Sequence, residues 1–173
     1  LVGSEMCIRD SSLLSENKKI EFEGYEKFLF ENIFHGFSSY QFKKIIDISH
    51  VNNCYQGQTI IEQDTFLDEI YLIINGKLEI SVHGQSVASL KTGDFVGEMS
   101  FITNEKTKAN VIASSADVRV LSWNTKKLKN LLSKHPELNS LFTATLGRQL
   151  ISELMERSLK DSSSKKDSLK LVA

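Results

Sequence analysis

The chain reads GDFVGEMSF over residues 93–101 and TKANVIA over residues 107–113, and this stretch decides the fold. It lies between two β-type runs and holds a short helical segment after Gly97. A glycine at that position lets another molecule approach the backbone without a Cβ clash. The unpaired amides at the start of the short helix offer donors and a positive dipole end to a negatively charged group. The stretch therefore predicts an anion-binding turn set into a β-structure.

The surrounding sequence, residues 51–123, is typical of an all-β core, because short β-type runs alternate with turn signals at intervals of about ten residues. Asn75-Gly76 separates two of these runs and predicts a hairpin with a type I′ turn, in which both central residues need positive φ. His83-Gly84 and residues 92–94 predict two further turns. Two later runs complete a roll or barrel of about eight strands.

Helices are predicted on both sides of this core. Residues 20–50 carry apolar side chains at roughly helical spacing with one break, which predicts two short helices, the second with Ser38 or Ser39 as its N-cap. Asn124-Thr125 predicts another helix start, and Pro136 suits the first turn of a longer helix. The longer helix carries an apolar stripe that can cover the roll and also meet a second subunit: Leu138, Leu141, Phe142, Leu146, Leu150, Ile151, Leu154 and Met155.

Composition and charge exclude several classes of protein. The apolar fraction of 40% and the charged fraction of 25% are close to the average of soluble globular domains. The net charge of -1 gives no broad basic field, and too few residues follow the long helix for a helix-turn-helix, so no DNA partner is expected. No run reaches the roughly 18 apolar residues of a transmembrane helix, which predicts a cytoplasmic domain. The two cysteines fit neither a disulfide framework nor metal-ligand spacing.

The chain divides into four expected segments. Residues 1–11 resemble the translation of a sequencing-library adapter, so we expect a non-native scar there and a gene that is cut off upstream of about Ser12. Residues 12–19 are expected to form a linker, and residues 20–160 a single domain. Residues 161–173 are polar and low in complexity, which predicts a disordered tail.

The stretch 93–113 resembles the phosphate-binding cassette of cyclic-nucleotide-binding domains, whose pattern is Phe-Gly-Glu, a short helix, then Arg-x-Ala-Ser/Thr-Val. The resemblance implies a mainly β fold with flanking helices: an antiparallel, jelly-roll-like β-roll with N-terminal helices and a long C-terminal helix. It implies cyclic AMP or cyclic GMP as ligand, no other cofactor, and a carboxylate at Glu98 that accepts from the ribose 2′-hydroxyl. The implied ligand-binding residues are Gly97, Glu98, Met99, Ser100, Thr107, Lys108, Ala109 and Asn110.

One departure from this pattern affects the ligand directly. Thr107 occupies the position of the phosphate-pairing arginine, and Asn110 replaces the small hydroxyl residue. Lys106 and Lys108 flank the position, but lysine is a point charge and lacks the planar fork of a guanidinium. Losing two charge-assisted hydrogen bonds costs several kcal/mol, or roughly two or more decades of affinity, so the sequence predicts a weakened or altered site.

The C-terminal part narrows the resemblance. Ser122-Trp123 before a helix, and residues 141–148, resemble the end of Popeye-type domains, which also lack the arginine. Residues 97–100 read Gly-Glu-Met-Ser and not the vertebrate Popeye signature Asp-Ser-Pro-Glu, so the chain is most similar to microbial Popeye-like proteins. Members of that group carry membrane helices just before the domain. The resemblance thus implies that the intact protein is tethered to the inner membrane through a missing N-terminal segment.

Three functions remain open at this point. The first is a regulatory sensor that binds cyclic AMP or a related nucleotide weakly and transmits a change through the C-terminal helix, which also forms a homo-oligomer. The second is a ligand-free roll that serves as a dimerisation or interaction module, which the threonine in the arginine position favours. The third is a cupin-like enzyme, but the four histidines are scattered and form no His-x-His pair, so neither an enzyme nor a metal site is expected: His35, His50, His83 and His135.

Overall fold

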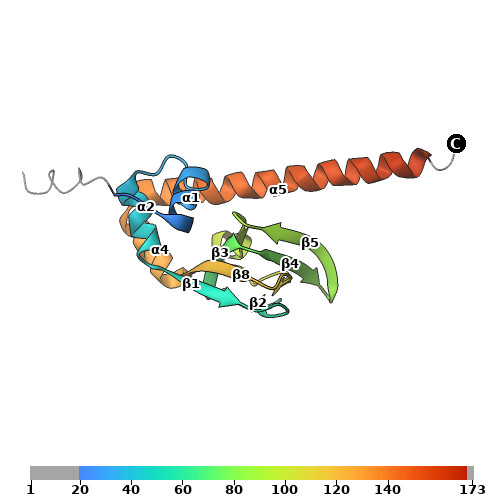
Figure 1. Ribbon diagram of the computed structural model, residues 1–173, viewed down its shortest axis with the longest axis horizontal. Coiled ribbons are helices and arrows are strands. Elements are labelled where there is room, and N and C mark those ends of the chain that lie inside the picture. Colours follow the sequence, from blue (N-terminus) through green and yellow to red (C-terminus); the bar gives the residue numbers. More distant parts are fainter. Residues whose placement is uncertain (1–19, 171–173) are drawn as a thin grey trace, which may run out of the picture.

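Two four-stranded antiparallel sheets form the roll in the computed structural model, which describes residues 20–170 (Figure 1). The first sheet contains, in spatial order, β1 (Ser49–Cys54), β8 (Val118–Asn124), β3 (Glu69–Asn75) and β6 (Phe95–Val96). The second contains β2 (Thr59–Ile61), β7 (Asn110–Ala113), β4 (Lys77–Val82) and β5 (Gln85–Lys91). The predicted antiparallel roll with eight strands in residues 51–123 is confirmed, with β1 starting two residues earlier.

The helices lie in the stretches where they are predicted, and those that begin at Ser39, Thr125 and Pro136 start at predicted signals. They are α1 (Gly24–Asn32), α2 (Ser39–Ile46), α3 (Glu98–Thr103), α4 (Thr125–Lys134) and α5 (Pro136–Lys170). The hydroxyl of Ser38 accepts a hydrogen bond from the Gln41 amide at 3.2 Å, and the Gln41 side chain accepts from the Ser38 amide at 2.9 Å. Asn124 caps α4 by accepting from the Lys127 amide at 3.1 Å. These side chains satisfy amides that would otherwise lack partners in the first turn.

The hairpin predicted at Asn75-Gly76 is wrong. β3 pairs with β8 and β6, and β4 pairs with β5 and β7, so the two strands belong to different sheets. Asn75 ends β3, and the chain crosses to the second sheet at Gly76, which has a φ of 89°. The hairpin with two positive φ angles is at His83-Gly84 instead, with φ values of 51° and 79°, and it joins β4 to β5.

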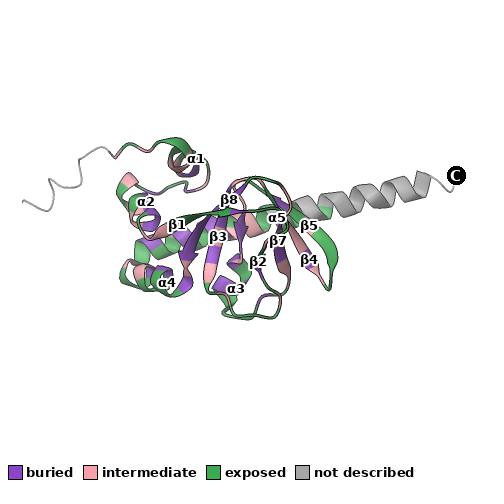
Figure 2. Ribbon diagram, turned by 60° about the horizontal axis from the view of Figure 1, so that its bottom comes forward, coloured by how far each residue is buried: buried purple, intermediate pink, exposed green. Residues whose placement is uncertain are grey.

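An aromatic cluster between the first sheet and the helices forms the larger core, and Figure 2 shows buried residues on β3 and β8. Phe142 of α5 lies edge-on to Phe95 and Trp123, with ring centroids 6.1 and 6.4 Å apart. Trp123 is completely buried, and its indole N–H donates to the carbonyl of Ile45 at 2.8 Å. This bond ties α2 to β8 while satisfying the one polar group of the indole.

Among the α5 side chains whose burial the structure describes, the buried ones lie near the start of the helix. Leu138, Phe142 and Leu146 are in the core, whereas Ile151, Leu154 and Met155 are 56 to 64% exposed. Figure 1 shows the helix running alongside the roll and extending past it. The predicted stripe therefore covers the roll with its first three turns and leaves Ile151, Leu154 and Met155 exposed.

The predicted segments at the two ends of the chain are only partly described by the structure. α5 continues through residues 161–170, where the sequence predicts a disordered tail, and no proline or glycine follows Gly147 to end it. Residues 171–173, the expected scar at 1–11 and the expected linker at 12–19 lie outside the described residues. Within residues 20–170, no helix is both long enough and apolar enough to span a bilayer.

Gly76 and Gly84 provide a matched test of the crossing between the sheets. A Cβ at Gly76 would lie 2.5 Å from the carbonyl oxygen of Asp117, whereas a Cβ at Gly84 would have no atom within 4 Å. Both residues have positive φ, so alanine costs about 1 to 2 kcal/mol at either position. We expect Gly76→Ala to lower the free energy of unfolding by about 1 to 3 kcal/mol more than Gly84→Ala, measured by urea denaturation. Equal losses would contradict the packing described at the crossing.

Candidate functional site

The cassette, defined here as residues 93–110, leaves the first sheet and returns in the second. β6 pairs with β3 at Leu72 and Phe95 and at Tyr71 and Val96, and α3 and a loop then lead to β7. The turn before β6 closes as predicted, because the Lys91 amide donates to the Asp94 carboxylate at 2.8 Å. The cassette therefore bridges the two sheets.

Gly97 sits at the point where β6 becomes α3. It has a φ of 87° and serves as the N-cap of α3. A Cβ at this position would lie 3.0 Å from the side chain of Leu67 and 3.2 Å from that of Ile61. The positive φ and the close packing against Leu67 and Ile61 thus both favour glycine here, in addition to the ligand approach that the sequence predicts.

The next three predicted site residues separate into two groups. Glu98 and Ser100 are each only 9% exposed, whereas Met99 is 55% exposed. The Glu98 side chain takes part in interactions within the protein and is not isolated. A carboxylate removed from water in this way must be offset by partners, so its placement at the start of α3 is a costly feature of the cassette.

Thr107, in the arginine position, faces inward. Its side chain is 4% exposed, and its hydroxyl donates to the carbonyl of Glu62 at 2.5 Å and accepts from the amide of Thr65 at 3.1 Å. The main chain adds a bond from the Asp64 amide to the Thr107 carbonyl at 2.9 Å and one from the Thr107 amide to the Thr65 carbonyl at 2.8 Å. Thr107 therefore fixes the loop 62–65 to the cassette.

Asn110, the second departure from the family pattern, also binds the loop 62–65. The side-chain carbonyl of Asn110, at the start of β7, accepts from the Gln63 amide at 2.9 Å. Asn110 and Thr107 together hold the loop 62–65 at two points, and the side-chain amide N–H₂ of Asn110 is left as a donor. Sequence reasoning did not find this loop, because backbone groups accept and donate whatever their residue type.

The two lysines beside Thr107 lie on the surface. Lys108 has a side chain that is 77% exposed and pairs with Glu105 at 3.2 Å. Lys106 places its ammonium 5.5 Å from the ring centroid of Phe66. Ala109 is half-buried between Lys108 and β7. The structure therefore brings Gly97, Glu98, Ser100, Thr107 and Asn110 into one bridging element and leaves Met99 and Lys108 at its exterior.

Tyr71 lies opposite Val96 in the β3–β6 pairing, next to the start of the cassette. Burial raises the pKa of Tyr71 to about 12, and the negative charge of Glu69 and a hydrogen bond to it add to the effect. The phenol is therefore neutral at physiological pH and adds no negative charge beside Gly97.

The described residues hold no group of three or more His, Cys, Asp or Glu side chains that could bind a metal ion. His135, the residue directly after α4, contacts a lysine and not a cluster of ligands: its Nε2 atom lies 3.3 Å from the ammonium of Lys44 in α2.

The role assigned to Thr107 predicts a specific loss in Thr107→Val, which keeps the side-chain shape but removes the hydroxyl. Because the Glu62 carbonyl and Thr65 amide lose a buried partner, the free energy of unfolding should fall by about 1 to 3 kcal/mol. Amide hydrogen exchange at Thr65 should accelerate in Thr107→Val and remain slow in Thr107→Ser, which keeps the hydroxyl. Unchanged exchange at Thr65 in the valine variant would contradict the assignment.

Comparisons with known proteins agree with this geometry. Residues 51–135 match the family model of the cyclic nucleotide-binding domain. The chain is 26% identical over 108 residues to the Pycsar effector protein BcPycTIR of Burkholderia cepacia, covering 62% of this chain and 36% of the relative. It is 28% identical over 130 residues to the cAMP-dependent protein kinase regulatory subunit of Mycosarcoma maydis, covering 70% of this chain and 25% of the relative. The chain thus spans little more than a third of the first relatives' length.

Solved structures share the fold. A putative cyclic nucleotide-binding protein from Geobacter metallireducens GS-15 superposes with a TM-score of 0.68 at 20% identity, covering 77% of this chain and 99% of that one. The catabolite activator protein of Thermus thermophilus gives a TM-score of 0.59 at 25% identity, covering 75% of this chain and 62% of that one. Residues 51–135, which span most of the roll, thus match the cyclic nucleotide-binding domain family, and the solved structures share its fold.

Proposed function

We propose that the roll is a regulatory, non-catalytic module that binds a nucleoside cyclic monophosphate at the cassette. The observation that carries the proposal is Glu98, an enclosed carboxylate directly after a positive-φ glycine, in a roll of the cyclic nucleotide-binding family. A carboxylate there can accept the ribose 2′-hydroxyl, and the first amides of α3 can donate to the cyclic phosphate. One of the relatives is, by name, a regulatory subunit of a cAMP-dependent protein kinase.

The cassette also supports weak binding. The hydroxyl of Thr107 is hydrogen-bonded to the loop 62–65 and cannot replace a guanidinium. Lys108 is paired with Glu105 at the surface. The phosphate would then rely on main-chain amides and on the side-chain amide of Asn110, without a bidentate charged partner. We infer an affinity roughly two decades below that of a cassette with a guanidinium at this position.

The change is transmitted through one aromatic contact. Phe101 of α3 packs edge-on against Phe142 of α5, with ring centroids 6.1 Å apart. A ligand shifts a conformational equilibrium only if it binds the two states with different affinity. A nucleotide that binds more tightly to one position of α3 would therefore move Phe101, and through it Phe142 and α5.

A ligand-free assembly module is the second candidate. The exposed residues Ile151, Leu154 and Met155 favour it, because they lie within two turns of one another on the part of α5 that leaves the core. In this reading the roll positions α5 for a homo-oligomer. The proposal keeps the Popeye-like resemblance in either case, with a cytoplasmic roll and an intact protein tethered to the inner membrane by a segment upstream.

Calorimetric titration of the 173-residue chain with cyclic AMP, cyclic GMP, cyclic CMP and cyclic UMP tests the proposal. At least one nucleotide should bind, and Glu98→Ala should weaken it at least tenfold by removing a charge-assisted hydrogen bond. Glu31→Ala is the control, because this exposed carboxylate of α1 lies outside the cassette and should leave the affinity unchanged.

The unfolding midpoints of both variants must first be compared with that of the parent chain, so that lost binding is not lost folding. No heat from any of the four nucleotides at millimolar concentration, with a folded parent chain, would overturn nucleotide binding. Sedimentation of the same sample would then test the assembly module. A dimer that dissociates in Leu154→Lys would support it.

A further inference from the structure

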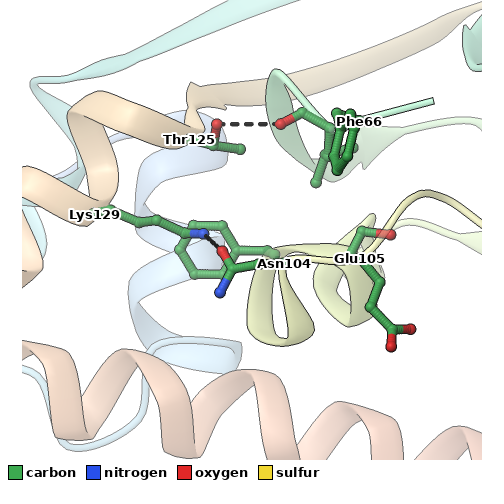
Figure 3. A pocket seen from close by; sticks show the side chains of 8 residues that line it. Phe66, Asn104, Glu105, Thr125 and Lys129 are labelled. Carbon is green, nitrogen blue, oxygen red and sulfur yellow. Dashed lines mark hydrogen bonds between the residues drawn. The ribbon is translucent and has the colours of Figure 1, made fainter.

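A pocket of about 240 Å³ lies between α3, α4 and the segment before β3 (Figure 3). Gly97 and Glu98 are not part of its lining. Its walls come from three separate parts of the chain, and none of Gly97, Glu98, Thr107 or Asn110 lines it. The lining residues are Phe66, Leu67, Ser100, Phe101, Asn104, Glu105, Thr125 and Lys129. The pocket therefore adjoins the proposed nucleotide site at Ser100, which was also predicted for that site, while the rest of its lining is separate.

A positive charge is held at this pocket. The ammonium of Lys129 donates a hydrogen bond to the side-chain carbonyl of Asn104 and lies 5.0 Å from the centroid of the Phe101 ring (Figure 3). Asn104 is held in place as the C-cap of α3, with a φ of 58°. Among the described residues, no carboxylate pairs with Lys129.

The other ionic groups near the pocket do not cancel this charge. Glu105 is the one carboxylate in the lining, and its charge is paired with Lys108 at 3.2 Å. Lys106 lies over the ring of Phe66 and adds a second positive charge close to the pocket. An anion in the pocket would thus meet a net positive field.

The pocket also contains an enclosed polar group. Ser100 lines the pocket and is only 9% exposed. Thr125 also lines it, and its hydroxyl donates to the carbonyl of Leu67 at 3.2 Å. A serine hydroxyl in the lining can donate a hydrogen bond to a bound anion.

We propose that this pocket is a second ligand site, which takes a small organic monoanion with an apolar body of about one ring. The rings of Phe66 and Phe101 and the side chain of Leu67 contact the apolar body, Lys129 pairs with the anionic group, and Ser100 hydrogen-bonds to it. The volume sets the size, because engineered apolar cavities of about 150 Å³ hold a benzene molecule and pockets for larger ligands start at about 300 Å³. Since α3 forms one wall, the ligand would also bias the position of the cassette helix.

Titration of the ¹⁵N-labelled 173-residue chain with benzoate, benzamide and benzylamine tests the charge and the place of binding. Benzoate should shift the amides of residues 66, 67, 100–105 and 125–129 saturably, with a dissociation constant in the millimolar range. Benzamide, which keeps the ring and loses the charge, and benzylamine, which reverses the charge, should each bind at least roughly fivefold more weakly.

Lys129→Gln keeps a long polar side chain without the charge and should weaken benzoate roughly fivefold. Lys127→Gln is the matched control, because it removes an exposed charge from the same helix outside the pocket and should change nothing. Ser100→Ala should also weaken the binding of benzoate relative to the parent chain, and it should weaken the binding of benzamide less. The proposal would be overturned by equal binding of benzoate and benzylamine, by shifts that never saturate, or by equal losses in the two lysine variants.

Discussion

The packing of one side chain, Phe142, connects the parts of this molecule. Its ring lies against Phe34, Phe95, Phe101 and Trp123, which come from the N-terminal helical region, β6, α3 and β8. A fully buried phenylalanine contributes about 1.5 to 3 kcal/mol through burial alone. The more important effect is geometric, because α5 can keep this position only while α3 and the first sheet keep theirs.

The cassette combines a family framework with a local solution of its own. Gly97 and Glu98 start α3 as the family pattern requires, but the two departures, Thr107 and Asn110, turn their polar groups toward the loop 62–65. At the position where the family has a phosphate-pairing arginine, the hydroxyl of Thr107 forms hydrogen bonds with the protein's own backbone. These bonds stabilise the roll without a ligand, and under the proposed function they also leave the phosphate without a bidentate charged partner.

The features that could be predicted from the sequence are those set by neighbouring residues. Ser38, Asn124 and Pro136 act within one helical turn, so their patterns indicated the helix starts correctly. The Asn75-Gly76 signal failed because pairing between strands depends on partners far along the chain, and Asp117 and Val118 occupy the space beside Gly76. The inward role of Thr107 depends on contacts 42 and 45 residues away, and a threonine in a polar stretch carries no sign of them. The pocket beside Lys129 likewise joins three segments that no local pattern relates.

The central claim is that a cyclic nucleotide bound at the cassette acts on α5 through Phe101 and Phe142. It is tested most directly by following the amide shifts of residues 97–101 and 142–146 in one titration with whichever cyclic nucleotide binds. The account predicts that both groups shift and saturate with the same dissociation constant, because one contact couples α3 to α5. Shifts at residues 97–101 without any change at residues 142–146 would contradict the coupling, and no shift in either group at saturation would contradict binding at the cassette itself.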